Sequence, residues 1–222
     1  MIWMAVTALL FVASDALYRA AGRRAYVHPV LLPVTVLVAA HQLGALDLAA
    51  YGSATEPFSV MLSVAVVGLA VPLVRNLGVM QQNRAAVLAA IAGGSITGVM
   101  TAIVPALLLG TPEGLLASLA TKSITTPLAI TTAEAIGGVP AIAVGIVLVT
   151  GFVVALVGPA VLRMLGVDDE TAMGLAIGTA GHGIGTAEAV RLSDAMGGAA
   201  ALAMTINGLT TALVLPLVWP LS

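Results

Sequence analysis

The sequence predicts an all-α polytopic membrane protein with about seven or eight segments that cross or re-enter the bilayer. Sixty per cent of the residues are hydrophobic and only 8% are charged, whereas roughly 25% of residues are charged in soluble proteins. The mean hydropathy is +1.12, and successive apolar runs approach the ~20 residues that a helix needs to cross a bilayer. These observations predict one integral membrane domain over residues 1–222.

Composition also argues against several other classes of function. The net charge of −2 offers no basic surface for nucleic acid. There is no cysteine for a disulfide or a thiolate metal site, and we expect no metal and no cofactor. Motifs of zinc proteases and of serine hydrolases are missing. Ser123 and Lys122 are neighbours, so on a helix they would not face each other as a catalytic pair, and we do not expect an enzyme.

The first half of the chain is expected to hold four helices. The apolar run over residues 2–20 is read as a retained helix, because its basic residues follow it instead of preceding it. Arg19, Arg23 and Arg24 mark the cytoplasmic side, and Asp15 is expected to be solvated or paired with one of them. The other helices are expected from Pro29 to near Asp47, over 58–74 and over 85–109, with an external loop from Asp47 to Glu56.

The second half is expected to hold segments over 115–136, 141–165, 171–192 and 198–221. The division near Gly110 gives halves 1–110 and 111–222, each with a third segment that is short or interrupted. Paired interruptions of this kind point to a transporter site. If residues 115–136 span the bilayer, the halves are parallel repeats; if they enter and return, the later helices are inverted relative to the earlier ones.

The first polar stretch is K-S-I-T-T-P, residues 122–127. A lysine within a membrane segment is rare and usually functional, although one near a helix end can reach the interface. Lys122 with the hydroxyls of Ser123, Thr125 and Thr126 can bind a carboxylate by charge and hydrogen bonds. Pro127 opens the helix by removing a backbone donor. The alternative is that the hydroxyls bond to carbonyls of their own helix.

The second polar stretch is G-T-A-G-H-G-I-G-T, residues 178–186. Each glycine costs a helix about 1 kcal/mol relative to alanine, so two half-helices with a break are expected, and Gly178 is assigned to the break. His182 can contact the solute or carry a coupled proton, or it can pair only with a backbone carbonyl. The predicted substrate-binding residues are Lys122, Ser123, Thr125, Thr126, Thr179, Gly181, His182, Gly183, Gly185, Thr186 and Asn207.

Two other features carry expectations. Glu188 and Arg191 are three residues apart on one helix, which predicts a surface ion pair. The stretch G-G-S-I-T-G, residues 93–98, is rich in small residues that permit close helix contacts in lipid. We therefore expect a homo-oligomer, most simply a dimer.

At these residues the chain resembles the LrgB/CidB family, which includes the plastid glycolate/glycerate translocator. The resemblance covers almost the whole chain. It is carried by K-S-I-T-T-P-L-A from Lys122, I-G-G-V-P-A from Ile136, G-T-A-G-H-G-I-G-T-A from Gly178 and L-A-M-T-I-N-G-L-T-T from Leu202, with weaker support from A-V-P-L at Ala70. The chain departs from the family pattern in three places: Thr121 replaces a proline, Glu188 replaces a basic residue, and residues 63–66 replace Gly-Pro-Ala-Thr.

The resemblance implies a multi-pass protein of the bacterial inner membrane. It implies a secondary transporter of small monocarboxylates such as glycolate, glycerate or pyruvate, or alternatively a holin/antiholin-like regulator of murein hydrolases and autolysis. The expected partners are the carboxylate, membrane lipid, a second copy of the chain and a small holin-like membrane protein. Because Glu188 is acidic where the family is basic, that position is not expected to bind the anion.

Overall fold

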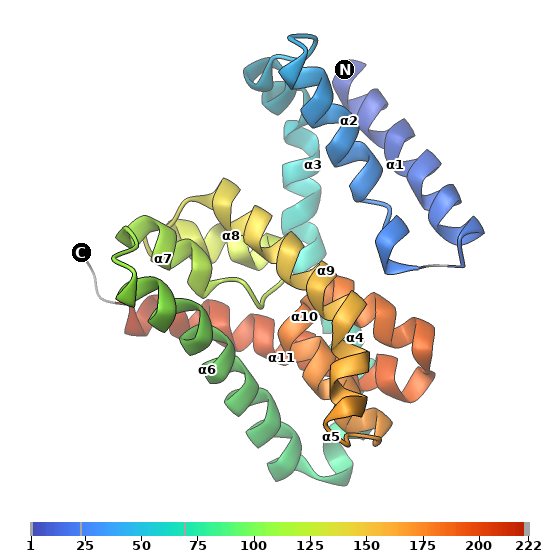
Figure 1. Ribbon diagram of the computed structural model, residues 1–222, viewed down its shortest axis with the longest axis vertical. Helices are drawn as coiled ribbons and strands as arrows, with labels where there is room; N and C mark the ends of the chain where they lie inside the picture. The colour runs from blue at the N-terminus through green and yellow to red at the C-terminus, as the bar shows by residue number, and fades with distance from the viewer. Residues whose placement is uncertain (1, 23, 69, 220–222) are drawn as a thin grey trace. The chain divides into compact units, whose positions relative to one another are not determined.

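The computed structural model describes residues 2–22, 24–68 and 70–219, for some of them the backbone alone, and every regular element within these ranges is helical (Figure 1). Within them, α1, α6, α9 and α11 are long and apolar enough to cross a membrane. The predicted all-α membrane class is confirmed. The elements are α1 (Ile2–Ala20), η1 (Ala25–Val27), α2 (Leu31–Gln42), α3 (Leu48–Gly68), α4 (Ala70–Arg75), α5 (Leu77–Gln82), α6 (Arg84–Leu108), α7 (Glu113–Ala120), α8 (Thr126–Ala135), α9 (Pro140–Met164), α10 (Glu170–Leu192) and α11 (Asp194–Val218).

The chain forms two compact units, residues 1–65 and 66–222. In the first unit, α1 packs beside α2, and aromatic side chains tie α1 to the start of α3. The rings of Trp3 and Tyr51 meet edge to face at 6.4 Å between centroids. The hydroxyls of Thr7 and Tyr51 are 3.0 Å apart. All residues of the two polar stretches lie in the second unit.

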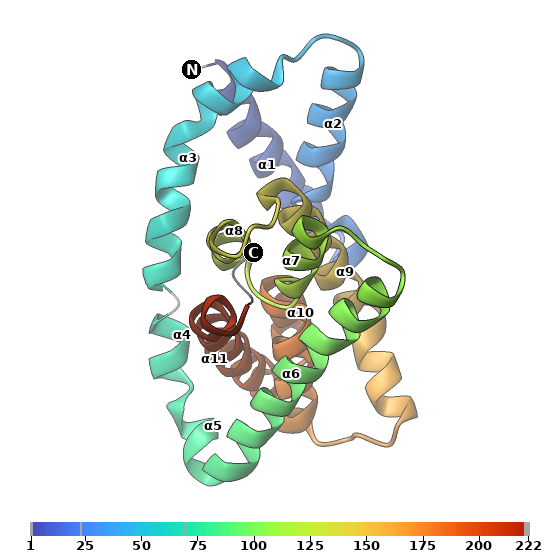
Figure 2. The same cartoon turned by 90° about the vertical axis from the view of Figure 1, so that its left-hand side faces the viewer.

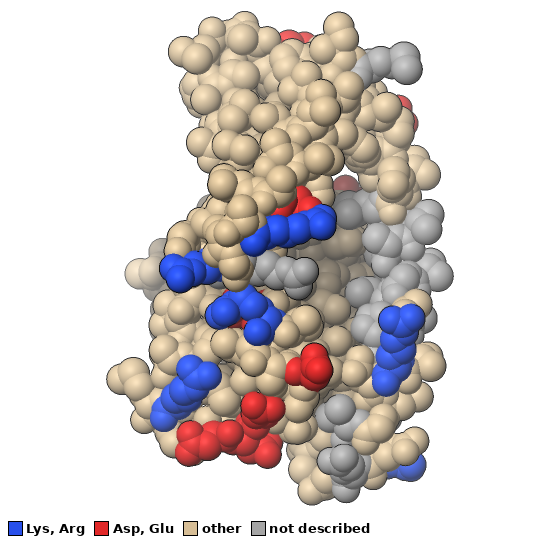
Figure 3. Space-filling view, turned by 90° about the vertical axis from the view of Figure 1, so that its right-hand side faces the viewer, with Lys and Arg blue, Asp and Glu red and all other residues tan. Residues whose placement is uncertain are grey.

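Charged side chains are sparse on the surface and concentrate near helix ends. Figure 3 shows one face on which uncharged residues make up most of the surface. Arg19 Nε donates to Asp15 Oδ2 at 2.8 Å, which confirms the expected pairing of Asp15. Arg24 donates to the hydroxyl of Tyr26 at 2.8 Å. Arg23, the third member of the predicted basic cluster, lies outside the described residues.

The third helix begins ten residues earlier than the sequence analysis placed it, so the predicted external loop between Asp47 and Glu56 is wrong. Asp47 accepts hydrogen bonds from the amides of Ala49 and Ala50, at 3.4 and 3.0 Å, and these bonds start α3. Pro57 is accommodated inside the helix. Two short helices follow. α4 lies at the end of the expected helix over 58–74, and α5 lies in the connection expected between that helix and the one over 85–109.

The segment over 115–136 is a hairpin of two short helices, α7 and α8, and not one long helix. At 1.5 Å per residue each helix is only about 12–15 Å long, less than half of the ~30 Å hydrocarbon layer. The two outer ends of the hairpin lie together, because the Val139 amide donates to Ser118 Oγ at 2.8 Å and Gly114 packs against the carbonyl of Gly137. Figure 2 shows α7 and α8 side by side. The chain therefore doubles back over this segment, as expected of a segment that does not span.

Helices α10 and α11 form a second hairpin whose backbones approach closely (Figure 1). Ser193 alone separates them, and its hydroxyl caps α11 by accepting from the Met196 amide at 3.1 Å. A Cβ atom at Gly178 would collide with the backbone of Ala200, and one at Gly174 with the backbone of Met196. Glycine spacing on α10 thus decides how near α11 can come.

We expect Gly178→Ala to destabilise the protein by about 1–3 kcal/mol, because the added methyl group overpacks the α10–α11 contact. Gly145→Ala is the matched control, since a Cβ there meets open space and alanine improves helix propensity by up to about 1 kcal/mol. Thermal unfolding in detergent, followed by circular dichroism, measures both. Equal unfolding temperatures for the two variants would contradict this packing.

Candidate functional site

The first helix break is the tip of the α7–α8 hairpin, residues 121–125. The side chains of Thr121, Ser123 and Ile124 are buried, and those of Lys122 and Thr125 are half-buried. Helix α8 begins directly afterwards, with Pro127 in its first turn, where a missing N–H costs least. Pro127 therefore stands at the break, as predicted, and serves as the start of the next helix.

The second break is at His182, inside α10. Its φ of 40° and ψ of −133° are not helical, whereas the residues on both sides of it are. This confirms that the glycine-rich stretch forms two half-helices. The assignment of Gly178 to the break is corrected: Gly178 lies in the regular part of α10, where its lack of a side chain admits the backbone of Ala200.

The two breaks meet at the side chain of Asn207 in α11, which is 1% exposed. Asn207 Nδ2 donates to the Ser123 carbonyl at 2.8 Å and to the Thr179 carbonyl at 3.0 Å. Asn207 Oδ1 accepts from Thr211 Oγ1 at 3.2 Å and also has Ser95 Oγ of α6 in hydrogen-bond contact. The carbonyl oxygens of Ser123 and Thr179 are both acceptors, so the nitrogen of the Asn207 side-chain amide must lie on their side. We call these five residues the Asn207 cluster.

The amide supplies donors that the broken backbone lacks. A helix leaves its last four carbonyls without an intrahelical partner, and Thr179 falls in the last turn before the break at His182. Ser123 lies in the non-helical tip, where its carbonyl likewise has no helical partner. In hydrocarbon each such group costs several kcal/mol if it stays unpaired. Asn207 thus makes both interruptions tolerable at one point.

Helix α6 approaches the Asn207 cluster through two glycines. A Cβ at Gly94 would lie 2.9 Å from Thr179 Cγ2, and one at Gly98 would lie 3.2 Å from Ser123 Oγ. A Cβ at Gly93 would meet open space. Two glycines of the small-residue stretch are therefore occupied by contacts within the chain, so the stretch gives less support to a dimer than the sequence suggested.

The imidazole of His182 is buried against α9. Its Nε2 lies 2.9 Å from the carbonyl of Val147, and Gly151 makes room for the ring, since a Cβ there would be 2.7 Å from Cε1. The carbonyl accepts, so Nε2 carries the hydrogen and Nδ1 is the acceptor in the neutral ring. Of the roles predicted for His182, pairing with a backbone carbonyl is the one that the structure shows.

Lys122 brings a positive charge to the hairpin tip. Its ammonium donates to Ser123 Oγ at 3.2 Å, and among the described residues it has no carboxylate within salt-bridge distance. Lys122 is also near enough to His182 to interact with it electrostatically. In the same loop, Thr125 Oγ1 is buried and has no hydrogen-bond partner among the described residues. The tip therefore combines an uncompensated cation with an unused hydroxyl.

The other predicted site residues lie on α10 or at the start of α8. Thr179 Oγ1 bonds to the Leu175 carbonyl of its own helix at 2.7 Å. Thr186 Oγ1 faces the Ala200 carbonyl at 3.5 Å. Gly181 packs against Val154 and Gly185 against Ile177. The remaining two, Gly183 and Thr126, are exposed and half-buried respectively.

Three residues that hold this arrangement were missed by the sequence analysis: Ser95, Thr211 and Gly151. Ser95 lies inside the G-G-S-I-T-G stretch, and Thr211 is four residues after Asn207, hence on the same helix face. Those positions were detectable as polar residues in apolar helices. Gly151 gave no comparable signal, because its role depends on a ring that approaches from a different helix.

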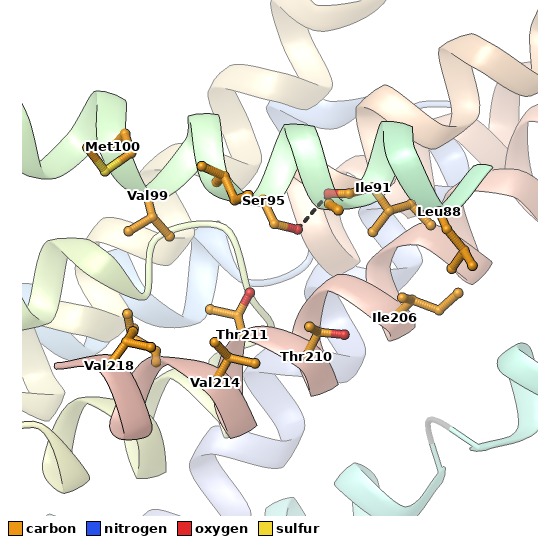
Figure 4. Close-up of a pocket in the computed structure, with 13 residues that line it drawn as sticks. Leu88, Ile91, Ser95, Val99, Met100, Ile206, Thr210, Thr211, Val214 and Val218 are labelled. Atoms are coloured by element: carbon orange, nitrogen blue, oxygen red, sulfur yellow. Dashed lines mark hydrogen bonds between the residues drawn. The ribbon is translucent and has the colours of Figure 1, made fainter. Parts of the chain in front are cut away.

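Two grooves flank α6 beside the Asn207 cluster. One, of about 450 Å³, lies between α6 and α11 and includes Ser95 and Thr211; Figure 4 shows its aliphatic walls and the bond from Ser95 to the Ile91 carbonyl, 2.7 Å long. The other, of about 470 Å³, lies between α6 and α10 and includes Gly94 and Thr179. Neither groove is lined by Lys122 or His182.

The predicted pair of Glu188 and Arg191 is confirmed, but not as a surface pair. Arg191 Nε donates to Glu188 Oε2 at 2.8 Å, and a second bond joins Nη2 to Oε1 at 2.5 Å. The Glu188 side chain is only 9% exposed, against 36% for Arg191. Glu188 is thus a buried, neutralised carboxylate.

We expect Asn207→Ala to destabilise the protein by about 1–3 kcal/mol for each buried group that loses its partner. The carbonyls of Ser123 and Thr179 are the groups at risk. Thr205→Val is the control, because Thr205 is equally buried on α11 and its hydroxyl bonds to the Ala201 carbonyl of its own helix. Chemical unfolding in mixed micelles measures both, and equal stability would show that Asn207 does not hold the breaks.

At position 182 we expect glycine to be more stable than alanine. Inside a regular helix, alanine is normally more stabilising than glycine by about 1 kcal/mol. A φ of 40°, however, strains any residue that has a Cβ, typically by about 1–3 kcal/mol. Both His182→Ala and His182→Gly lose the bond to Val147, so their difference isolates the backbone. Thermal unfolding of the two variants measures this difference in stability. If His182→Ala were the more stable of the two, the backbone at the break would not be strained.

Comparisons with known proteins identify the family of this chain. The model of the LrgB-like family matches residues 7–221. The chain is 30% identical to the uncharacterized protein YwbG of Bacillus subtilis over 95% of this chain and 93% of that one. It is also 30% identical to antiholin-like protein LrgB of Bacillus cereus, over 77% of this chain and 74% of that one. No solved structure matches. The chain belongs to the LrgB-like family of membrane proteins.

Proposed function

We propose that the protein is a secondary transporter of small monocarboxylates, with the anion held at its two helix breaks. The observation that carries this proposal is the convergence of both breaks on Asn207 beside a lysine without an acidic partner among the described residues. Interrupted helices that meet inside a bundle are how many transporters place polar backbone groups around a substrate. Lipid-facing backbone could not be broken in this way.

The chemistry of the hairpin tip suits a carboxylate of a few carbon atoms. The Lys122 ammonium supplies charge, and the hydroxyls of Ser123 and Thr125 supply directional hydrogen bonds. Thr125 Oγ1 has no partner among the described residues, so a bound oxygen would satisfy it at no cost to other bonds. Glycolate, glycerate and pyruvate are the candidate substrates, and the amides near Gly181–Gly185 are proposed to face the anion.

His182 is the proposed site of proton linkage. Because Nε2 is committed to the Val147 carbonyl, a coupled proton would bind at Nδ1. Proton binding there would place a second positive charge near Lys122, which favours an anion.

We further propose a bacterial inner membrane location and a small holin-like membrane protein as partner.

The second candidate function is an antiholin-like regulator of murein hydrolases and autolysis. The names of the Bacillus cereus relatives favour it, and these comparisons support it more than they support transport of a given acid. A regulator that works through protein contacts has no need of an uncompensated lysine at a helix break. The two functions therefore differ in whether Lys122 matters.

The deciding measurement is uptake of labelled glycolate, glycerate and pyruvate into proteoliposomes. A hydrogen bond to a charged group is worth about 1.5–3 kcal/mol, so we expect Lys122→Ala to reduce uptake at least tenfold. Arg163→Ala is the control, because Arg163 is an exposed cation in the last turn of α9.

Two outcomes would contradict this proposal, the first by moving the site away from Lys122 and the second by rejecting transport itself. Uptake that is equal in Lys122→Ala and the unaltered protein would remove Lys122 from the site. Absence of uptake for all three acids, combined with a change in autolysis when the gene is deleted that Lys122→Ala restores fully, would assign the regulatory function instead.

A further inference from the structure

The groove between α6 and α10 opens where both helices begin. Asn83 accepts from the Ala86 amide at 3.3 Å to cap α6, and Asp169 accepts from the Ala172 amide at 2.7 Å to cap α10. All four residues line the groove. Capping residues and charged neighbours belong at the edge of a membrane rather than in its hydrocarbon. The outer end of the groove is therefore in contact with water.

The walls of this groove are made of small residues. Among the described residues, its lining includes Ala86, Ala90, Ala172, Ala176 and Ala180, with Val87 and Leu175 as the larger aliphatic side chains. The groove on the other side of α6 is lined mainly by isoleucine, valine, leucine and methionine, with Ser95, Thr210 and Thr211 as its polar side chains (Figure 4). The aliphatic lining of the α6–α11 groove suits lipid chains. The small residues of the α6–α10 groove instead leave a channel of about 470 Å³ with polar groups at both ends.

The inner end of the groove reaches the Asn207 cluster. Gly94 and Thr179 close it, and there is no room for a side chain at Gly94, since a Cβ would lie 2.9 Å from Thr179 Cγ2. The carbonyl of the same Thr179 accepts the bond from Asn207. One residue thus separates the end of the groove from the amide that joins the two helix breaks.

The outer end of the α6–α10 groove, its mouth, carries both positive and negative charge. The N-terminus of a helix carries about half a positive charge, and two such ends, those of α6 and α10, meet the mouth. The Asp169 carboxylate opposes them, although it is engaged as a cap. Arg84, the first residue of α6, follows Asn83 directly. These groups together leave a mouth that hydrates readily and does not exclude a small anion.

We propose that the α6–α10 groove is the aqueous entrance to the site, and that the contact between Gly94 and Thr179 is its inner closure. The ligand class is a small carboxylate, so the inference rests on the proposed function. It adds the route by which the solute arrives and the side of α6 on which it travels. Thr179, whose hydroxyl bonds only within its helix, acts here through the bulk of its side chain.

Cysteine labelling tests the route directly, because the chain contains no cysteine of its own. Ala90→Cys and Ala176→Cys place a thiol in the α6–α10 groove, and Ala92→Cys places one in the α6–α11 groove as the matched control. The probe is sulfonatoethyl methanethiosulfonate, a membrane-impermeant anion that reacts with the thiolate. Thiolates form only where water reaches, and we expect the two groove variants to react at least about tenfold faster than the control.

The outcomes separate this inference from the proposed function. Fast labelling that millimolar glycolate, glycerate or pyruvate slows supports both. Labelling no faster than that of Ala92→Cys, in a protein whose uptake still depends on Lys122, overturns the entrance and leaves transport intact. Fast labelling that no acid slows, in a protein without uptake, keeps a water-filled groove but overturns it as a route for carboxylates.

Discussion

One buried side-chain amide holds the polar interior of this protein together. Asn207 donates to a carbonyl in the α7–α8 tip and to a carbonyl before the break in α10, and its oxygen contacts hydroxyls from α6 and α11. The two helix breaks would otherwise leave backbone groups unpaired in hydrocarbon, where the cost is several kcal/mol each. A fully satisfied buried network also fixes geometry, so the position of each break depends on the others.

The close approach that this network needs comes from small residues. Gly94 and Gly98 bring α6 against Thr179 and Ser123, and Gly151 brings α9 against His182. Gly178 does the same between α10 and α11. Lipid provides no hydrophobic force between helices, so packing of this kind supplies the attraction. Gly94 also lines the narrow groove along α6, together with alanines of α6 and α10.

Much of the fold could be predicted from the sequence, because long apolar runs bounded by charges or glycine have few alternatives in a membrane. Expected segments such as 2–20, 85–109 and 171–192 match α1, α6 and α10 within one residue at each end. The start of α3 could not be found by hydropathy, since Asp47 begins it with side-chain hydrogen bonds in a polar region. The hairpin over 113–135 also stayed ambiguous, because length alone did not say whether the chain returns.

The sequence by itself determined the membrane class, the family and the two stretches where regular helix fails. Local chemistry suffices for these, since glycine, proline and charge act on the chain in which they stand. Only the tertiary structure decided that the breaks meet at Asn207 and that Gly178 packs against α11 instead of breaking its helix. It also decided that Glu188 is buried while paired with Arg191. Such facts depend on which carbonyl or side chain a neighbouring helix presents, and no local pattern in the chain encodes that partner.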